Sequence, residues 1–401
     1  MSAKAEEAVE KRYISRRIWK ARLQSIPFYL FRLFPIKKNK IVFCCIEGTT
    51  GYTCNPKYIA EELIRRGGGF QLVWLVNDIT KEFPEEIQVV HNTLWKRAYH
   101  LATAHFWVDN SRKQLEVRKR KGQIYIQTWH AKLGFKPTCL DRGKSFSKIA
   151  YLVSKHDSDM IDYVLSNSKW YDDTLPTGMI YSGSVLRTGS PRCDILVNNR
   201  ERQHRKVRER YGLPLQAGIM MYAPTFRGGS QGINRDLAIN QKYPDYERVI
   251  NALEKRFKRP WYIFLRLHPQ LVVRNMDEPY KTNKYIVDVS RVDDMYKILA
   301  GCDAFMTDYS SAAFDAAIME VPVFLYADDY AEYEAERGKL LWDLRKLPFP
   351  LAANNEELER QIVEFDETRY RQELEVLFTD VEMTEDGKAA AHVVDRIEEL
   401  T

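Results

Sequence analysis

The chain lacks any long uninterrupted apolar run, any Cys-x-x-Cys spacing and any His-Glu-x-x-His motif, and it shows no signal peptide. A single helix that crosses a bilayer needs about 20 consecutive apolar residues, so a membrane-spanning helix is not expected. The six cysteines are scattered, which disfavours a disulfide framework and indicates a reduced, cytosolic environment. Because no Cys/His cluster is present, no metal site is predicted.

The composition is otherwise ordinary for a globular protein, with 45% hydrophobic residues, 29% charged residues and a net charge of +6. A chain of 401 residues exceeds the usual size of one hydrophobic core, so two domains are predicted. Basic residues gather in the first forty positions and in segment 198–211, without stacking aromatic residues among the polar motifs described below. This distribution disfavours nucleic acid as a partner.

Residues 1–39 combine basic residues with apolar ones at roughly helical spacing. The basic set is Lys11, Arg12, Arg16, Arg17, Lys20 and Arg22, and the apolar set begins with Tyr13, Ile14, Ile18, Trp19 and Leu23. A basic amphipathic segment of this kind is typical of a helix that lies on an anionic membrane surface. The alternative is an N-terminal helix that packs on its own domain and leaves its charges in solvent.

From residue 40 onward, short apolar runs alternate with helical segments. Strands are expected at 40–46, 71–76, 106–109, 123–127, near 219, 263, 286 and 303, and at 321–326; helices are expected at 56–66, 95–103, 198–211, 246–257, 293–300 and 311–320. Such alternation predicts parallel sheets. We therefore predict an α/β fold of two Rossmann-like domains that face a cleft, over residues 40–205 and 206–401, in which the last helix is able to pack back on the first domain.

Four of the apolar runs end in small polar clusters. His130 follows the first of these runs, Thr225 and Arg227 the second, Arg266 and His268 the third, and Asp308, Ser310 and Ser311 the fourth. In open α/β sheets, ligands bind outside the carboxyl ends of the strands. Histidine, arginine and serine at four such ends predict a single site for a negatively charged substrate.

Each cluster also has a simpler explanation. Ser310 and Ser311 could hold a phosphate at a helix start, or Ser310 could merely cap that helix. Arg266 and His268 share a strand face and could bind a diphosphate, or His268 could pack beneath a loop. His130 could act as a base or stack beside its neighbouring tryptophan, while Arg227 could neutralise transition-state charge or simply be solvated.

Asp308 stands alone, without a second carboxylate that would complete a magnesium site. It is therefore better suited to shaping its loop than to binding a metal. We include it with the residues of the anion site because it lies between Thr307 and Ser310 at the same strand end.

At these positions the chain resembles the CDP-glycerol glycerophosphotransferase family, whose members prime and polymerise wall teichoic acid, and related capsule polymerases. The resemblance covers about residues 40 to 395 and rests on the motifs Asn55-Pro56-Lys57-Tyr58, Gln127-Thr128-Trp129-His130, Gly189 to Asp194, Tyr222 to Arg227, Leu265 to Pro269, Thr307 to Ser311, Arg337-Gly338 and Asp386-Gly387. It implies a GT-B fold, a CDP-linked donor held by the C-terminal domain, and attachment to the cytoplasmic face of the bacterial membrane as a peripheral protein.

The resemblance also implies the roles of the site residues. His130 and His268 are the expected catalytic residues, with His130 as the base on the acceptor side. The donor phosphates are expected to be held by Thr225, Arg227, Arg266, Asp308, Ser310 and Ser311. No cofactor is expected, because the CDP-polyol is itself a substrate.

The expected reaction is transfer of glycerol phosphate, or another polyol phosphate, from a CDP-activated donor to a hydroxyl of a lipid-linked saccharide acceptor, with release of CMP. A second hypothesis is a GT-B glycosyltransferase that uses a nucleotide sugar for cell-surface polysaccharide, because the fold does not fix the donor. A third is a membrane-surface scaffold with a vestigial cleft.

Overall fold

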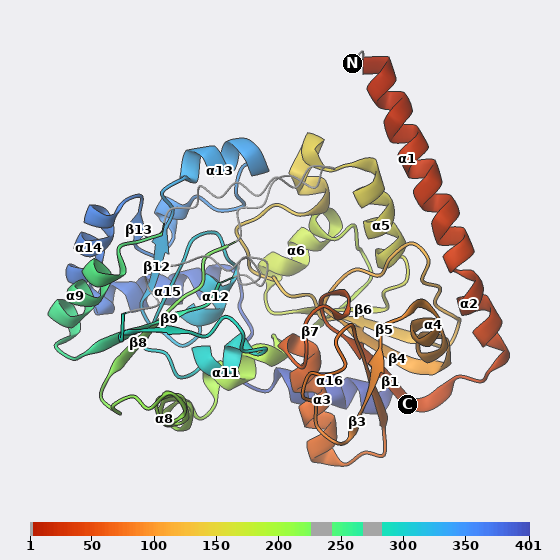
Figure 1. Ribbon diagram of the computed structural model, residues 1–401, viewed down its shortest axis with the longest axis horizontal. Helices are drawn as coiled ribbons and strands as arrows, with labels where there is room; N and C mark the ends of the chain where they lie inside the picture. Colours follow the sequence, from red (N-terminus) through yellow and green to blue (C-terminus); the bar gives the residue numbers. More distant parts are fainter. Residues whose placement is uncertain (1–2, 226–242, 268–282) are drawn as a thin grey trace.

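The computed structural model describes residues 3–225, 243–267 and 283–401, and its strands form two parallel sheets that lie side by side (Figure 1). The first sheet has the strand order β3-β2-β1-β4-β5-β6-β7 and the second has the order β10-β9-β8-β11-β12-β13. The strands of the first sheet are β1 (Lys37–Cys44), β2 (Gln71–Val76), β3 (Ile87–His91), β4 (Ala104–Asp109), β5 (Ile124–Gln127), β6 (Tyr163–Ser166) and β7 (Ser184–Arg187). Those of the second are β8 (Gly218–Tyr222), β9 (Trp261–Leu265), β10 (Ile286–Asp288), β11 (Ala304–Thr307), β12 (Val323–Tyr326) and β13 (Leu351–Ala352). The predicted α/β class with two Rossmann-like domains is confirmed.

Helices cover both sheets and connect successive strands. They are α1 (Ala3–Gln24), α2 (Ile26–Leu30), α3 (Cys54–Arg66), α4 (Leu94–Thr103), α5 (Lys148–Ser158), α6 (Lys169–Gly178), α7 (Asp194–Val197), α8 (Arg200–Tyr211), α9 (Tyr246–Phe257), α11 (Met295–Leu299), α12 (Ala312–Ala317), α13 (Tyr330–Arg337), α14 (Asn355–Val363), α15 (Glu367–Asp380) and α16 (Ala389–Glu399). The short 3-10 turns η1 (Phe31–Leu33) and η4 (Pro191–Cys193) follow α2 and β7.

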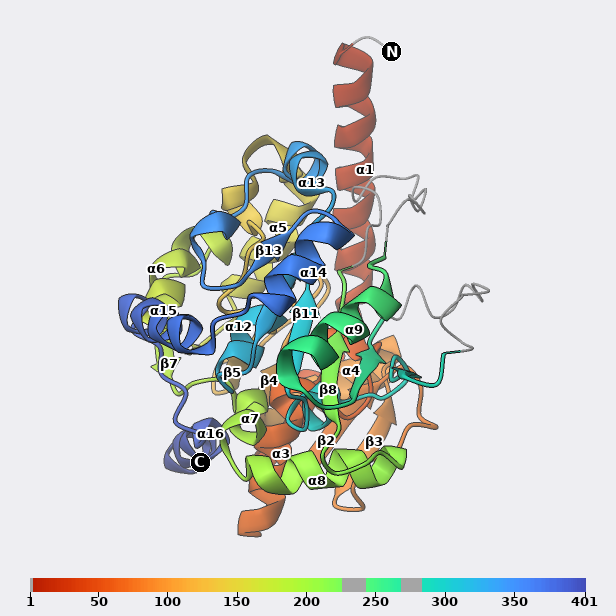
Figure 2. The same ribbon diagram turned by 90° about the vertical axis from the view of Figure 1, so that its left-hand side faces the viewer.

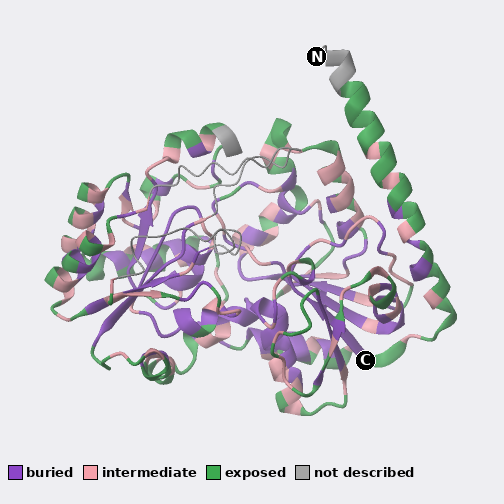
Figure 3. Ribbon diagram, in the orientation of Figure 1, coloured by how far each residue is buried: buried purple, intermediate pink, exposed green. Residues whose placement is uncertain are grey.

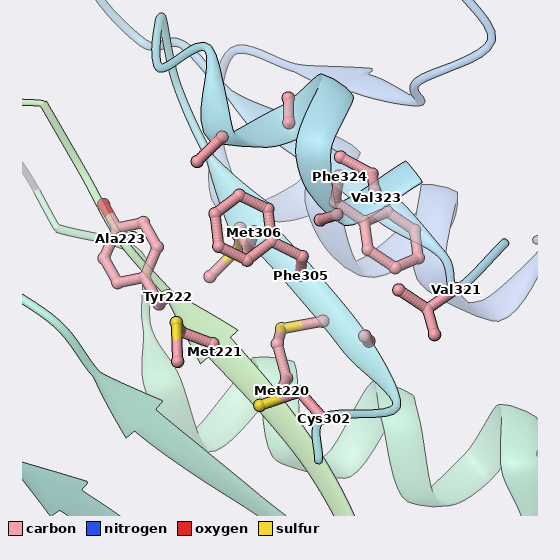
Figure 4. Packing of buried hydrophobic residues seen from close by; sticks show 14 of the residues in the cluster. Met220, Met221, Tyr222, Ala223, Cys302, Phe305, Met306, Val321, Val323 and Phe324 are labelled. Atoms are coloured by element: carbon pink, nitrogen blue, oxygen red, sulfur yellow. The ribbon is translucent and has the colours of Figure 1, made fainter. Parts of the chain in front are cut away.

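The central strands of the second sheet are continuous apolar runs because both of their faces are covered. All residues of β8, β11 and β12 are buried. Figure 4 shows how Met220, Met221, Phe305, Met306 and Phe324 pack against one another in this core. Strands that are buried on both sides read as unbroken hydrophobic runs, which is why these strands were visible in the sequence.

Each sheet has a point where the chain reverses its direction of winding. In the first sheet this switch lies between β1 and β4, and in the second it lies between β8 and β11. Ligands of such folds bind outside the carboxyl ends of the strands at the switch point. Thr225 follows β8 and Asp308 follows β11, so both lie at the switch point of the second sheet.

The last helix, α16, returns to the first sheet. Its residues Val393, Val394 and Ile397 join the core that α3 forms on one face of that sheet. Arg66 of α3 pairs with Asp395 at 2.6 Å and with Glu398 at 2.8 Å. The chain therefore crosses between the two sheets twice, at α8 and again before α16.

Helix α1 projects from the body of the molecule in both views (Figures 1 and 2), and most of its residues are exposed (Figure 3). Its predicted amphipathic character is not confirmed, because its apolar residues do not share one face. Ile14 and Ile18 lie on one side of the helix, while Val9, Tyr13 and Leu23 lie on the other. In the described part of the chain, no helix is both long enough and apolar enough to cross a bilayer.

Candidate active site

His130 lies in a loop that backbone and side-chain hydrogen bonds fix firmly. The loop leaves β5, and its Trp129 has a left-handed backbone with φ 47°. Gln127 Oε1 accepts a hydrogen bond from the Trp129 N–H at 3.0 Å. The His130 ring lies against Trp129, with 4.6 Å between ring centroids. The contact with Trp129 that offered an alternative to catalysis is therefore present, with the two rings tilted by 37°.

The imidazole of His130 is held in one tautomer. Its Nδ1 lies 2.8 Å from the Asn110 carbonyl oxygen, and because a carbonyl only accepts, Nδ1 carries the hydrogen. Burial lowers the pKa of His130 to about 4, against the raising effect of the hydrogen bond to the Asn110 carbonyl; the Arg192 and Arg112 charges lower it further and Asp109 raises it slightly. At neutral pH the ring is thus uncharged and its Nε2 has a free lone pair, as a general base requires.

A cavity of about 260 Å³ lies between the two sheets and brings four of the predicted site residues together. His130 lines it from the first domain, and Thr225, Ser310 and Ser311 line it from the second. The two domains touch directly beside it, because the Leu341 N–H donates to the Phe135 carbonyl at 2.8 Å. A base and three hydroxyl-bearing residues therefore line the same cavity.

A larger hollow of about 890 Å³ lies elsewhere, between α13, α14 and α15 at the outer edge of the second sheet. Its described lining runs from Ala327 to Glu373 and includes none of the predicted site residues. Size alone does not identify an active site, so the smaller cavity with the convergent polar groups is the better candidate.

Asp308 joins the two strand ends of the second domain. Its side chain is buried, and its carboxylate accepts hydrogen bonds from the Thr225 N–H at 2.9 and 3.1 Å and from the Tyr309 N–H at 2.6 Å. These bonds set the position of Thr225 relative to Ser310. The described hydrogen bonds of Asp308 therefore hold the loops that follow β8 and β11 in place.

Ser310 and Ser311 are half-buried at the start of α12. Ser310 Oγ accepts a long hydrogen bond of 3.3 Å from the Ala312 N–H, so this serine does act as a cap. Ser311 makes no capping hydrogen bond with its side chain. Both hydroxyls remain able to donate to a ligand in the cavity, because a capping serine uses its oxygen as the acceptor.

Arg266 is not brought to this cavity. Its guanidinium donates to the carbonyls of Val289 at 2.9 Å and Ser290 at 2.6 Å, near the end of β10. Burial lowers its pKa. Two further predicted residues, Arg227 and His268, lie outside the described residues.

Several buried polar residues around the site were not given roles from the sequence. Asn55 of α3 donates from Nδ2 to the Trp129 carbonyl at 2.7 Å and to the Thr128 carbonyl at 3.2 Å. Asn110, which orients His130, directly follows β4, so its position at a strand end was a usable signal. Asn55 carried no such signal, because it lies on a helix.

A second buried cluster supports the floor of the cavity. Lys132 lines the cavity and donates from Nζ to Ser190 Oγ at 2.8 Å. The Ser190 N–H donates in turn to the carboxylate of Glu385, at 3.0 and 3.1 Å. Burial lowers the pKa of Lys132 and raises that of Glu385 to about 7. The segment before α16, which contains Glu385, therefore helps to support the floor of the cavity.

Among residues 3–225, 243–267 and 283–401, no group of three or more His, Cys, Asp or Glu side chains is arranged to hold a metal ion. All six cysteines are buried thiols.

Comparison with known proteins agrees with this geometry. Residues 26–399 match the family described as "CDP-Glycerol:Poly(glycerophosphate) glycerophosphotransferase". The chain is 28% identical over 378 residues to a teichoic acid glycerol-phosphate transferase of Staphylococcus aureus, covering 90% of this chain and 93% of that protein. It is 26% identical over 355 residues to a teichoic acid poly(glycerol phosphate) polymerase of Bacillus subtilis, covering 86% of this chain but only 46% of that longer protein.

Solved structures show the same fold. A variant of the wall teichoic acid polymerase TagF superposes with a TM-score of 0.80 at 23% identity, covering 99% of this chain and 98% of that one. Another TagF crystal was soaked with CDPG. A putative UDP-N-acetylglucosamine 2-epimerase of Listeria monocytogenes has a TM-score of 0.53 at 13% identity, covering 90% of this chain and 96% of that one.

Proposed function

Because the chain belongs to the CDP-glycerol:poly(glycerophosphate) glycerophosphotransferase family, we propose that it transfers glycerol phosphate from CDP-glycerol, or another polyol phosphate from its CDP derivative, to a hydroxyl of a lipid-linked acceptor. The observation that carries this proposal is the cavity in which His130 faces the hydroxyls of Thr225, Ser310 and Ser311. A base on one side and anion-binding groups on the other are what phosphoryl transfer between two substrates needs.

In the proposed step the acceptor oxygen forms a bond to the phosphorus that carries the polyol. The bond from that phosphorus to the bridging oxygen breaks, and CMP departs with the electron pair. His130 Nε2 takes the proton of the attacking hydroxyl, while its Nδ1–H stays bonded to the Asn110 carbonyl. Positioning and charge stabilisation provide most of the rate in such reactions.

The hydroxyls of Ser310 and Ser311 are the described groups best placed for the donor diphosphate. Charge-assisted hydrogen bonds from hydroxyls to phosphate oxygens are stronger than bonds between neutral groups. Asp308 would hold Thr225 and Tyr309 in place without touching the donor. Arg227 and His268 are proposed to complete this half of the site.

Incubation of the purified protein with CDP-glycerol and a synthetic lipid-linked saccharide tests the reaction. We expect CMP release that depends on the acceptor, and a product whose mass increases by one or more glycerol phosphate units. CDP-ribitol and UDP-sugars serve as competing donors. Release of UDP from a UDP-sugar, without CMP release from any CDP-polyol, would establish the glycosyltransferase instead.

We further propose that the protein attaches to the anionic cytoplasmic face of the bacterial membrane as a peripheral protein. An exposed apolar surface runs from the end of α1 to α4 and comprises Trp19, Leu23, Ile26, Tyr29, Leu30, Leu33, Phe34 and Trp95. Phe31 links its parts, because its ring packs edge-on against Trp95 at 6.1 Å and Tyr99 at 5.4 Å. Arg32, Lys37 and Lys38 are exposed in the same stretch of the chain as Leu33 and Phe34. Apolar side chains beside basic ones favour an anionic lipid surface.

Cosedimentation with vesicles tests the attachment. Leu33 is 88% exposed, and Leu33→Glu should weaken binding to vesicles that contain phosphatidylglycerol. Val376 is 60% exposed on α15, far from this surface in the sequence, so Val376→Glu is the matched control and should bind as the unsubstituted protein does. Equal binding by both variants would refute this surface as the attachment site.

A further inference from the structure

Asn55 ties the loop that carries His130 to a second segment of the first domain. The Asn55 side chain is 1% exposed. Its Nδ2 donates to the carbonyls of Thr128 and Trp129, and its Oδ1 accepts from the Arg192 N–H at 3.1 Å. One amide therefore uses both of its ends, and it fixes the peptide that directly precedes His130 against the backbone of η4.

Arg192 carries this connection into the second domain. Its guanidinium donates to Asp315 Oδ2 at 2.6 Å, and both side chains are nearly inaccessible to solvent. Tyr296 also donates to Asp315 from its hydroxyl, and the Arg192 guanidinium lies 4.8 Å from the centre of the Tyr296 ring. The buried Asp315 carboxylate therefore accepts from two donors, a guanidinium and a phenol. Such charge-assisted hydrogen bonds hold their partners in a defined geometry.

Asp315 lies on α12, the helix that begins directly after Ser311. The continuous path is therefore His130, Trp129 carbonyl, Asn55, Arg192, Asp315 and α12 with Ser311. It joins the predicted base to the predicted anion-binding hydroxyls through side chains instead of through the cavity. The strained backbone of Trp129, with φ 47°, needs such external hydrogen bonds to persist.

We propose that Asn55, Arg192 and Asp315 are positioning residues that set the separation between His130 and the Ser310–Ser311 hydroxyls, and so govern the transfer step rather than donor binding. This inference rests on the proposed function, because it assigns one substrate to each side of the cavity. A displacement of about 1 Å between reacting groups is enough to slow a reaction by about 10²-fold. Donor binding depends on groups of the second domain alone and should be spared.

A neighbouring ion pair provides a matched control. Lys57 of α3 pairs with Asp294 across the same interface, and both side chains are buried. The described hydrogen bonds of Asp294 go to Lys57, Tyr58 and the Tyr296 N–H, and not to the His130 loop. Loss of this pair removes a contact across the same interface but none of the hydrogen bonds on the path from Asn55 through Arg192 to Asp315.

The experiment compares Arg192→Met, Asp315→Asn, their double variant and Lys57→Met in the full chain. We expect the first two to slow single-turnover transfer by about 10²-fold while the Kd for CDP-glycerol stays within about threefold. The double variant should be no slower than either single one, because both break one connection. Lys57→Met should transfer within about threefold of the unsubstituted rate.

Three results would overturn the proposal: equal losses in donor affinity and transfer, multiplied losses in the double variant, or a loss in Lys57→Met as large as that in Arg192→Met. If Arg192→Met does not fold, Asn55→Ala takes its place. That change removes the bonds to the His130 loop without stranding a charge, and the same separation of transfer from binding is expected.

Hydrogen exchange separates this proposal from the proposed function. Asp315→Asn should speed exchange of the Trp129 amide in the other domain, and Asn55→Ala should speed exchange of the Phe314 amide in α12. If CDP-glycerol is neither bound nor consumed by the unsubstituted protein, the function is wrong while the connection can still be measured. If the Trp129 amide exchanges at an unchanged rate in Asp315→Asn, the connection is wrong whatever the reaction is.

Discussion

The two sides of the cavity differ in how completely the protein itself satisfies their polar groups. On the first-domain side, the His130 Nδ1–H, the Trp129 N–H and the Trp129 carbonyl all have partners within the protein. On the second-domain side, the one side-chain hydrogen bond of Ser310 among the described residues is a long capping bond, and Ser311 makes no side-chain bond to α12. The base is therefore fixed in advance, while the hydroxyls keep hydrogen-bonding capacity for a ligand. A site built this way should bind the donor and catalyse the transfer with separable groups.

Substitution of the base should give the largest effect. His130→Asn removes the lone pair of Nε2, so transfer should slow by about 10²- to 10⁴-fold while CDP-glycerol still binds. Acceptor-dependent CMP release measures the first quantity and calorimetry the second. His156 is the control, since it is half-buried, its pKa is also lowered chiefly by burial, and its Nε2 lies 3.0 Å from the Val117 carbonyl oxygen. His156→Asn should transfer normally. Normal transfer by His130→Asn would exclude it as the base.

Substitution of Asp308 should have the second-largest effect, and it should weaken binding of the donor. Asp308→Ala removes the carboxylate that accepts hydrogen bonds from the Thr225 and Tyr309 N–H groups. A buried N–H without a partner costs about 1–3 kcal/mol, so we expect the donor Kd to rise by about 10- to 100-fold as Thr225 and Tyr309 shift. An unchanged Kd would show that these loops do not form the donor site.

The two serine hydroxyls should have the smallest effects. Ser310→Ala or Ser311→Ala should raise the donor Kd by about 5- to 30-fold, as the loss of one hydrogen bond to a charged group would. Ser147 provides the control, because its side chain caps α5 by accepting from the Ala150 N–H and lies outside the cavity. Ser147→Ala should lower the melting temperature slightly and leave the Kd unchanged. If Ser310→Ala and Ser311→Ala instead lowered the melting temperature and left the donor Kd unchanged, these two serines would only cap α12.

Much of the fold could be predicted because its strands are buried on both faces or its helices carry clear signals. β2 and α9 begin and end where the sequence predicted, at Gln71–Val76 and Tyr246–Phe257. Helix α12 is shorter than the predicted 311–320 segment, because the Met319 and Glu320 N–H groups bond only three residues back, to the Ala316 and Ala317 carbonyls, so the chain after Ala317 forms tighter turns. Strands β3, β6, β7 and β13 were not predicted. Strand β13 has two residues, β7 is only partly buried, Gln88 and His91 interrupt β3, and the apolar run of β6 is only three residues long.

The site also contains residues that the sequence could predict and residues that it could not. His130, Thr225, Ser310 and Ser311 were recognisable because the strand-end rule applies to them, and the structure places them around one cavity. Arg266 satisfied the same rule, yet its long side chain turns toward the Val289 and Ser290 carbonyls. Asn55 and Arg192 lie on α3 and η4, where no strand-end argument reaches. Their role depends on which segments meet across the domain interface, and a single sequence does not state that.

One measurement tests most directly whether both sides belong to a single site: the pKa of His130 with and without bound donor, followed by NMR of labelled histidine. In the free protein, burial and the charges of Arg112 and Arg192 outweigh Asp109 and the Asn110 carbonyl and hold this pKa at about 4. A diphosphate bound at Ser310 and Ser311 would add negative charge nearby and favour the imidazolium, so the pKa should rise toward neutrality. A His130 pKa that stays unchanged when CDP-glycerol binds would contradict the account.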